Sequence, residues 1–340
     1  MKLDKEFSVN TLALDRKQQD VYNRNPHLRE IFINRKRFLV YTKDFVKEQR
    51  FLKLFPRGTD LRISPSRNVT TEHWGERKAM LTEIEFLTNY AKQGTFSVIY
   101  VGAAPGSHIN FLSTLFPQLD FILIDTKEFV AKETEKIHIC SENFTNELAK
   151  KYSRNGRDLL FICDIHTFGP HHDLDDYMVQ DMYDQMVWYS TLKPQASLLR
   201  FRILRAETYE YLKGDLILEP WASRRNTECR LVVVKDAPKT DYNNRAIEAA
   251  LAYFHDTTRT MFYEHDLNDS EAEGLDHCYD CRAEIFILHR YLSKIQNISN
   301  GKALIQKTAE MSFDISRNIQ DKTRPPITNG IRTLNVIQKK

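Results

Sequence analysis

The sequence predicts an α/β fold in which helices cover both faces of a doubly wound sheet. Three observations predict this class: short runs rich in β-branched residues alternate with helical stretches, a glycine-containing turn follows the first run, and an aspartate ends the second. Such alternation is typical of strand–helix–strand units whose strands share one sheet. The chain has 340 residues, 41% of them hydrophobic, which is enough to bury a large core.

The first predicted helix occupies residues 76–94. Apolar residues recur at helical spacing from Met80 to Ala91, and Gly94 is a natural stop. Lys78 lies off this apolar stripe, so the periodicity does not assign it to the core.

Six strands are predicted beyond this helix. Their sequences are FSVIYVG (96–102), LDFILID (119–125), DLLFICD (158–164), ASLLRFRIL (196–204), DLILE (215–219) and CRLVVVK (229–235). A helical segment from about Asp175 to Leu192, ended by Pro194, separates the third strand from the fourth. This order of elements is the one expected for a doubly wound sheet.

The pattern then becomes mostly helical, in NNRAIEAALAYF (243–254) and DCRAEIFILHRYLSKI (280–295). The last residues contain two prolines and a glycine and predict a loose tail. The expected organisation is a basic N-terminal extension, one domain that includes the C-terminal helices, and a tail, at residues 1–70, 71–300 and 301–340.

Positive charge is concentrated at the N-terminal end of the chain. Residues 1–70 contain 16 Lys and Arg against 8 Asp and Glu, whereas the whole chain has a formal net charge of only +3. Aromatic residues alternate with these cations, which suits a phosphate backbone and stacked bases. The alternative is an amphipathic helix whose aromatic side chains pack inward. The aromatic residues concerned are Phe38, Tyr41, Phe45, Phe51 and Phe55.

The sequence predicts a cytoplasmic protein without a membrane partner. No run approaches the roughly 18 consecutive apolar residues of a membrane-spanning helix, and the N-terminus MKLDKEFSVN lacks the apolar centre of a secretory signal. Five cysteines, an odd number spread over a long chain, predict a reducing compartment rather than a disulfide framework.

The turn VGAAPGSH, residues 101–108, joins the first predicted strand to a helix. Gly102 and Gly106 would let ligand atoms approach the backbone at the carboxyl end of the sheet. The turn departs from the dinucleotide fingerprint, because alanines stand where that pattern has its second glycine. Asp125 ends the second strand, where a carboxylate can accept hydrogen bonds from both ribose hydroxyls. Together these features predict an adenosine site without a diphosphate; the alternative is an ordinary strand–turn–helix connection.

This turn, with the sequence ILID after it, resembles the S-adenosylmethionine loop of the RrmJ/FtsJ-type RNA 2'-O-methyltransferases. The chain is especially similar to the poxvirus cap-specific mRNA 2'-O-methyltransferases, which also serve as stimulatory subunits of the viral poly(A) polymerase. The resemblance includes GERKAMLTEIEFL, LLFICDIHT, PQASLLRFR and TECRLVVV, and covers roughly residues 71–295. It implies a Rossmann-like methyltransferase sheet that binds S-adenosylmethionine. The implied cofactor residues are Gly102, Ala103, Ala104, Pro105, Gly106, Ser107, His108, Asp125 and Asp164.

The chemistry of this family depends on a Lys-Asp-Lys-Glu tetrad around the ribose 2'-hydroxyl. The resemblance assigns its first lysine to Lys78, its aspartate to Asp164 and its glutamate to Glu228. Arg200 stands where the family has the second lysine. A lysine amine can act as a general base, whereas a guanidinium stays charged in proteins. Arg200 would therefore steer the hydroxyl and stabilise developing negative charge.

Cap recognition is matched at fewer positions. The relatives clamp the methylated guanine between two aromatic rings and bind it with carboxylates. Here Arg205 replaces the expected aromatic residue and Glu207 matches one carboxylate, while Tyr209 and Tyr211 are close enough to substitute. The segment TDLRISPSRNVTTEH offers no aromatic partner upstream. The candidate substrate residues are Arg202, Arg205 and Glu207.

A zinc site is considered and not expected. His277, Cys278 and Cys281 form part of a zinc ligand set. His265 precedes them in the chain and His289 follows them. A zinc site normally has a fourth ligand at fixed spacing, and this segment predicts a helix. We expect a buried helix face here and no metal.

Two functions follow from these observations. The first is 2'-O-methylation of capped viral mRNA near its 5' end in the cytoplasm, in a viral factory or virion of a large DNA virus. The second is a catalytically weak or inactive RNA-binding subunit that stimulates a poly(A) polymerase catalytic subunit or a capping enzyme. Taken singly, each tetrad position also has an ordinary interpretation as a surface charge, a cap or an interstrand ion pair. A nicotinamide-dependent oxidoreductase conflicts with the turn.

Overall fold

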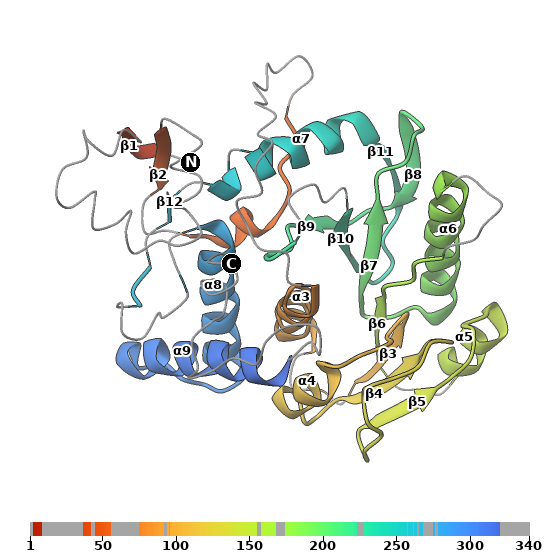
Figure 1. Cartoon of the computed structure of the whole chain (residues 1–340). Coiled ribbons are helices and arrows are strands. Elements are labelled where there is room, and N and C mark those ends of the chain that lie inside the picture. Colours follow the sequence, from red (N-terminus) through yellow and green to blue (C-terminus); the bar gives the residue numbers. More distant parts are fainter. Residues whose placement is uncertain are drawn as a thin grey trace.

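The computed structural model describes most of the predicted domain and short parts of the N-terminal extension (Figure 1). The described residues are 3–8, 37–41, 45–55, 75–91, 94, 96–154, 158–167, 174–222, 228–256, 258–260, 262–263, 265–267, 275 and 278–319. The segment 59–73, His277 and residues 320–340 lie outside this set, as do the side chains of Phe38 and Tyr41.

A seven-stranded sheet forms the centre of the molecule and confirms the predicted fold class. Its strand order is β5-β4-β3-β6-β7-β10-β9. The pairs from β5 to β7 are parallel, whereas β10 is antiparallel to both of its neighbours. The strands are β3 (Ser97–Val101), β4 (Asp120–Ile124), β5 (Ile137–Cys140), β6 (Leu159–Cys163), β7 (Ala196–Arg202), β9 (Asp215–Ile217) and β10 (Glu228–Val234).

All six predicted strands are present, and β5 is an addition that the sequence did not predict. Its four residues, IHIC, are too few and too mixed in polarity to give a strand signal. Two smaller sheets were also not predicted. One pairs β8 (Thr208–Leu212) with β11 (Lys239–Asn243), and the other contains β1 (Leu3–Ser8), β2 (Arg37–Tyr41) and β12 (Phe262–Tyr263).

Helices cover the two faces of the sheet, as predicted (Figure 1). One apolar cluster joins α3, α4, α8 and α9 to one face, and a second joins α5, α6 and α7 to the other. Consecutive strand residues alternate between the clusters: Val98 and Tyr100 belong to the first, Ile99 and Val101 to the second. The helices are α3 (Gly75–Tyr90), α4 (Ile109–Leu115), α5 (Asn146–Ser153), α6 (Leu174–Leu192), α7 (Asn244–Asp256), α8 (Tyr279–Lys294) and α9 (Gly301–Asn318).

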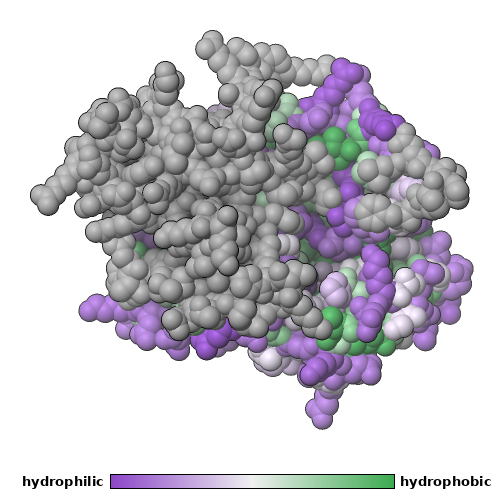
Figure 2. Space-filling view, viewed as in Figure 1, coloured by the Kyte–Doolittle hydropathy of each residue, from purple (hydrophilic) through white to green (hydrophobic). Residues whose placement is uncertain are grey.

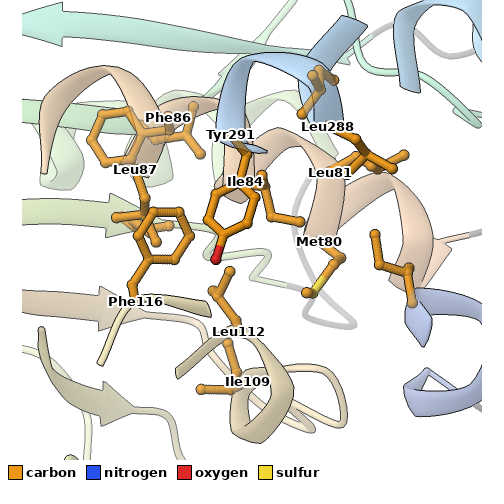
Figure 3. Close-up of a cluster of buried hydrophobic side chains, with 14 of the residues drawn as sticks. Met80, Leu81, Ile84, Phe86, Leu87, Ile109, Leu112, Phe116, Leu288 and Tyr291 are labelled. Atoms are coloured by element: carbon orange, nitrogen blue, oxygen red, sulfur yellow. The ribbon is translucent and has the colours of Figure 1, made fainter. Parts of the chain in front are cut away.

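The first cluster fixes the position of α3. Figure 3 shows Leu81, Ile84 and Leu87 of α3 in the same buried cluster as Leu112 of α4 and Tyr291 of α8. The Tyr291 hydroxyl donates a hydrogen bond of 2.8 Å to the Leu115 carbonyl oxygen, so its polar end is satisfied inside the core.

The expected tail at 301–340 begins with helix α9. Met311 and Ile315 of α9 are buried in the first cluster, and Thr308 and Ser312 are also inaccessible. The compositional argument for a tail came from the prolines after residue 320, which lie beyond this helix. The division of the chain into an extension, a domain and a tail stays a prediction.

The aromatic residues of segment 45–55 pack inward. Phe45 is buried, with its ring 5.6 Å from that of Tyr263 and 5.7 Å from that of Tyr279, and Phe55 meets Tyr253 edge to face at 5.0 Å. The interpretation of Phe45 as a base-stacking group is therefore wrong, whereas Phe55 is only half-buried. The predicted amphipathic helix is also absent from this segment, which forms only a short turn, Lys47–Arg50.

Arg50 anchors the same segment to the domain. Its guanidinium donates to both carboxylate oxygens of Glu85 in α3, at 2.8 to 3.2 Å, and to the Tyr279 hydroxyl at 2.7 Å. Backbone hydrogen bonds of 2.8 Å then join Leu52 to Leu216 and Leu218 to Arg50. Segment 50–52 thus pairs with the outer edge of β9.

No described helix combines the length and apolar character needed to cross a bilayer. The exposed large apolar side chains are scattered over several elements. The described part of the face in Figure 2 is mostly hydrophilic, with small apolar patches between hydrophilic residues.

Candidate active site

A cavity of about 620 Å³ lies at the carboxyl ends of β3, β4 and β6. Its volume is within the range that holds a cofactor-sized ligand. Helix α6 forms the opposite wall. The predicted residues that line it are Gly102, Ala104, Asp125, Asp164 and Arg200.

Gly102 allows the first strand to end against Asp164. Its φ is +75°, and a Cβ atom there would lie 2.7 Å from the carbonyl carbon of Asp164. Its N–H donates to the Ile124 carbonyl oxygen at 2.9 Å, and the Asp164 N–H donates to Val101 at 2.9 Å. The position requires glycine because it combines a left-handed backbone with a close backbone contact.

Asp125 follows β4, as predicted, and its carboxylate faces the loop. One oxygen accepts from the Ala104 N–H at 3.1 Å and the other from the Lys127 N–H at 3.0 Å. The carboxylate is thus held at the cavity wall by backbone donors.

The second half of the predicted cofactor loop supports the cavity and does not line it. Ser107 donates to Glu76 at 2.6 Å, and the two ring nitrogens of His108 lie 2.9 Å from Glu76 and Glu83 of α3. Burial alone would lower the pKa of His108, but the two carboxylates raise it to about 10. His108 therefore joins the loop to α3. The other predicted loop residues outside the lining are Ala103, Pro105 and Gly106.

A chain of alternating charges runs along the edge of this cavity. Lys78 Nζ lies 3.5 Å from Glu219, and the other Glu219 oxygen lies 3.2 Å from Arg230. Arg230 contacts Asp164 at 2.5 Å, and Asp164 contacts Arg200 at 2.9 Å. The structure thus brings Lys78, Asp164 and Arg200 into one network, although Lys78 joins it through two residues that the sequence did not predict.

The charge state of Asp164 follows from its neighbours. Burial would raise the pKa of this carboxyl, but the guanidinium groups of Arg230 and Arg200 lower it to about 2. Asp164 is therefore ionised throughout the neutral range.

Strand register explains why two arginines face one aspartate. Arg230 of β10 is the direct partner of Arg200 in β7, so both project to the same face of the sheet. Glu228 is two residues from Arg230 and pairs with Arg202, which places its Cα on the same face; its side chain is outside the described set. Period-two spacing from Glu228 is the signal that would have found Arg230.

Glu219 could be found only from the three-dimensional structure. It follows β9, next to β10, and its side chain is 1% exposed. In the sequence it ends a predicted strand that carries no motif.

The predicted cap residues divide into buried and exposed groups. Arg202 is buried in β7, while Arg205 and Glu207 are exposed beyond its end. Tyr211 is fully buried in the second cluster, so the interpretation of its ring as a substitute for the stacking aromatic is wrong. Tyr209 is half-buried, with its ring 6.0 Å from that of Tyr211.

The cysteines of the HCYDC segment begin helix α8. Cys278 is its N-cap and accepts a hydrogen bond of 3.4 Å from the Cys281 N–H, and both side chains are buried. Among the described residues, no group of three or more His, Cys, Asp and Glu side chains is arranged to hold a metal ion.

Sequence comparison finds relatives among poxvirus enzymes. The chain is 30% identical over 183 residues to the cap-specific mRNA (nucleoside-2'-O-)-methyltransferase of Fowlpox virus (strain NVSL), covering 48% of this chain and 59% of that protein. It is 24% identical over 182 residues to the protein of the same name in Myxoma virus (strain Lausanne), covering 48% and 53%. The chain thus spans about half the length of these relatives.

Structural comparison returns partial matches to solved structures. Bluetongue virus VP4, described as a multifunctional RNA-capping production line, matches with a TM-score of 0.43 and 13% identity over 54% of this chain and 32% of that chain. Human methyltransferase-like protein 13 in complex with SAH matches with a TM-score of 0.30 and 12% identity over 57% and 93%.

A family model described as poly A polymerase regulatory subunit matches residues 62–316. The match includes the seven-stranded sheet, the cavity, the charge network, helix α8 and most of helix α9. The chain belongs to the poly A polymerase regulatory subunit family.

Proposed function

We propose that the protein is an S-adenosylmethionine-dependent RNA 2'-O-methyltransferase that acts on the 5' cap region of viral mRNA in the cytoplasm. One observation carries this proposal: Asp164 and Arg200 line the cavity and also belong to the ion network. A methyl donor in the cavity and a hydroxyl at the network would therefore be neighbours.

The cavity fits this cofactor by shape and charge. Gly102 lines the cavity, Asp125 offers a carboxylate for ribose hydroxyls, and Phe144 and Trp188 supply apolar walls. Further carboxylates in the lining suit a ligand with a sulfonium and an ammonium group; they are Glu142, Asp181 and Asp184. When bound, S-adenosylmethionine supplies an electrophilic methyl group on a positively charged sulfur.

The protein's own groups would orient the hydroxyl. Arg200 and Lys78 present cationic donors that hold the ribose oxygen and stabilise negative charge as its proton leaves. Ionised Asp164 fixes the guanidinium of Arg200. Arg200 cannot accept the proton because a guanidinium stays charged in proteins, so the proton would leave to water while Arg200 and Lys78 act as cationic donors.

A second candidate is a regulatory RNA-binding subunit of a poly(A) polymerase. It is favoured by the family's description and by an arginine at the position where a base is expected. RNA and a polymerase or capping enzyme are the partners in both proposals.

The deciding experiment measures methyl transfer from labelled S-adenosylmethionine to short RNAs with and without a methylated guanosine cap. Transfer to a ribose 2'-oxygen of the capped RNA is expected, and Asp164→Ala should reduce it by about 100-fold or more. Asp120→Ala is the matched control, because Asp120 pairs with Lys136 at the opposite end of β4. Cofactor and RNA binding without transfer would favour the regulatory subunit.

The variant Arg200→Lys tests whether the arginine at this position limits the rate of methyl transfer. If Arg200 serves only to steer, the lysine variant should transfer methyl groups at a rate within about 10-fold of the wild type. A much larger gain in the same assay would indicate that the natural residue has lost a base.

A further inference from the structure

Glu219 occupies a position in the charge network that neither the sequence motifs nor the family description assigns. One carboxylate oxygen faces Lys78 Nζ at 3.5 Å and the other accepts from Arg230 Nε at 3.2 Å. The two contacts make Lys78 and Arg230 members of the same network, which continues to Asp164.

Exposure divides the network into two groups. The side chains of Lys78, Asp164 and Arg200 are 15%, 22% and 14% exposed, so they can meet a substrate. Those of Glu219 and Arg230 are 1% and 5% exposed. The exposed members would touch the substrate, and the buried members hold them.

The backbone around Glu219 is fixed on both sides. The Leu218 N–H donates to Arg50, and the Trp221 N–H donates to Asp280 at 3.2 Å. The Trp221 indole N–H donates to Glu284 at 2.9 Å. With its backbone held in this way, Glu219 is a rigid support for a lysine whose side chain is long and flexible.

We propose that Glu219 is a positioning residue for methyl transfer, which acts by holding Lys78 and Arg230. The inference rests on the proposed function, because it names the residue that organises the same site. Glu219 does not line the cofactor cavity. Its loss should therefore change turnover and leave cofactor binding intact.

The first test is Glu219→Gln, with Glu210→Gln as the matched control. Glu210 forms an exposed ion pair with Lys239 at 3.1 Å. We expect kcat to fall by about 10- to 100-fold in Glu219→Gln, with the Kd for S-adenosylmethionine and the Tm unchanged, and no effect in the control. A normal kcat, or a loss explained by unfolding or weak cofactor binding, would overturn the proposal.

A double-mutant cycle shows whether Glu219 acts through Lys78. In a Lys78→Met background, Glu219→Gln should reduce kcat by less than about threefold further, because the group it holds is gone. A purely structural role predicts full, independent losses in the double variant.

Chemical labelling tests the contact without requiring activity. An amine held in an ion pair reacts slowly with acylating reagents, so Lys78 should be labelled several-fold faster in Glu219→Gln than in the wild type, measured by mass spectrometry. Lys136, paired with Asp120 at 3.0 Å, is the internal reference. Equal labelling of Lys78 in both proteins would overturn the role of Glu219, whereas a wild type without methyl transfer would overturn the proposed function and leave this readout valid.

Discussion

Arg77 and Lys78 are adjacent in α3 and enter two different ion networks. The Arg77 guanidinium is fully buried and donates to both oxygens of Glu284, at 2.8 and 2.5 Å, and to Ser316 at 2.8 Å. Ser312 also bonds to both members of this pair. Lys78 has one ion-pair contact among the described residues, at 3.5 Å, and reaches solvent.

The difference shows how one helix serves both stability and function. In the Arg77 network the chain itself satisfies the charged groups, so nothing is left for a ligand. In the Lys78 network the ammonium has three donors and one ion-pair contact among the described residues, so it keeps hydrogen-bonding capacity for a ligand. We call a network closed when its charged groups are satisfied within the protein, as around Arg77, and open when a charged group keeps capacity for a ligand, as at Lys78. We expect closed networks to determine stability and the open network to determine activity.

Breaking the closed network should have the largest effect. Arg77→Met leaves Glu284 as a buried carboxylate without its main cation, which costs about 3 to 5 kcal/mol of unfolding free energy. Urea unfolding followed by circular dichroism measures this loss. Arg77→Met combined with Glu284→Gln removes both charges and should recover part of it; equal stability of the single variant and the wild type would contradict the comparison.

Opening the second network further should affect rate rather than stability. Lys78→Met is expected to lower methyl transfer by about 100-fold, equivalent to about 2.7 kcal/mol of transition-state stabilisation. Its unfolding free energy should change by less than about 1 kcal/mol, because Glu219 keeps its second cation, Arg230, when the lysine is removed. A stability loss as large as that of Arg77→Met would show that the two networks do not differ.

The closed network around His108 adds a pH dependence to the comparison. The pKa of His108 in the folded protein, about 10, lies above the ordinary value of 6.5. The contribution of His108 to stability is therefore complete below pH 6.5 and is lost as the pH rises through 10. The stability difference between wild type and His108→Asn should fall by about 1 kcal/mol per pH unit between pH 7 and 10. Unfolding curves recorded at each pH test this; a difference that stays constant with pH would exclude a charged His108.

The smallest effect is expected at the surface. Glu210→Gln breaks an ion pair in which both side chains are more than half exposed, at 61% and 51%. Its unfolding free energy should change by less than about 0.5 kcal/mol. Thermal unfolding measures this change, and the stability losses of the other variants are compared with it.

The sequence predicted the sheet because its buried strands produce strong local patterns. Runs such as SVIYV and LLFIC are apolar on both faces, since helices cover both sides. Strand β5 gave no such signal because it is short and at the edge. Gly102, Asp125 and Asp164 line the cavity, and the sequence could single them out because each directly follows a strand.

Side-chain partners across the fold could not be predicted in the same way. His108 is close to the cofactor loop in sequence, but Glu76 and Glu83, two turns apart on α3, bind it from another element. Alternation of aromatic and basic residues suits both RNA binding and core packing, and only the contacts of Phe45 decide between them. Glu219 meets Lys78 from 141 positions away along the chain.

The pairing of segment 50–52 with β9 also determines where this protein can be shortened. The family match begins at residue 62, yet Arg50 and Phe51 lie before that point and occupy the outer edge of the sheet. A chain that began at residue 62 would leave Glu85 without its cation and expose an unpaired edge, which invites association between copies. The shortest form of this protein that stays soluble should therefore start before Phe45. Solubility after truncation would depend on keeping segment 50–52 on the edge of β9.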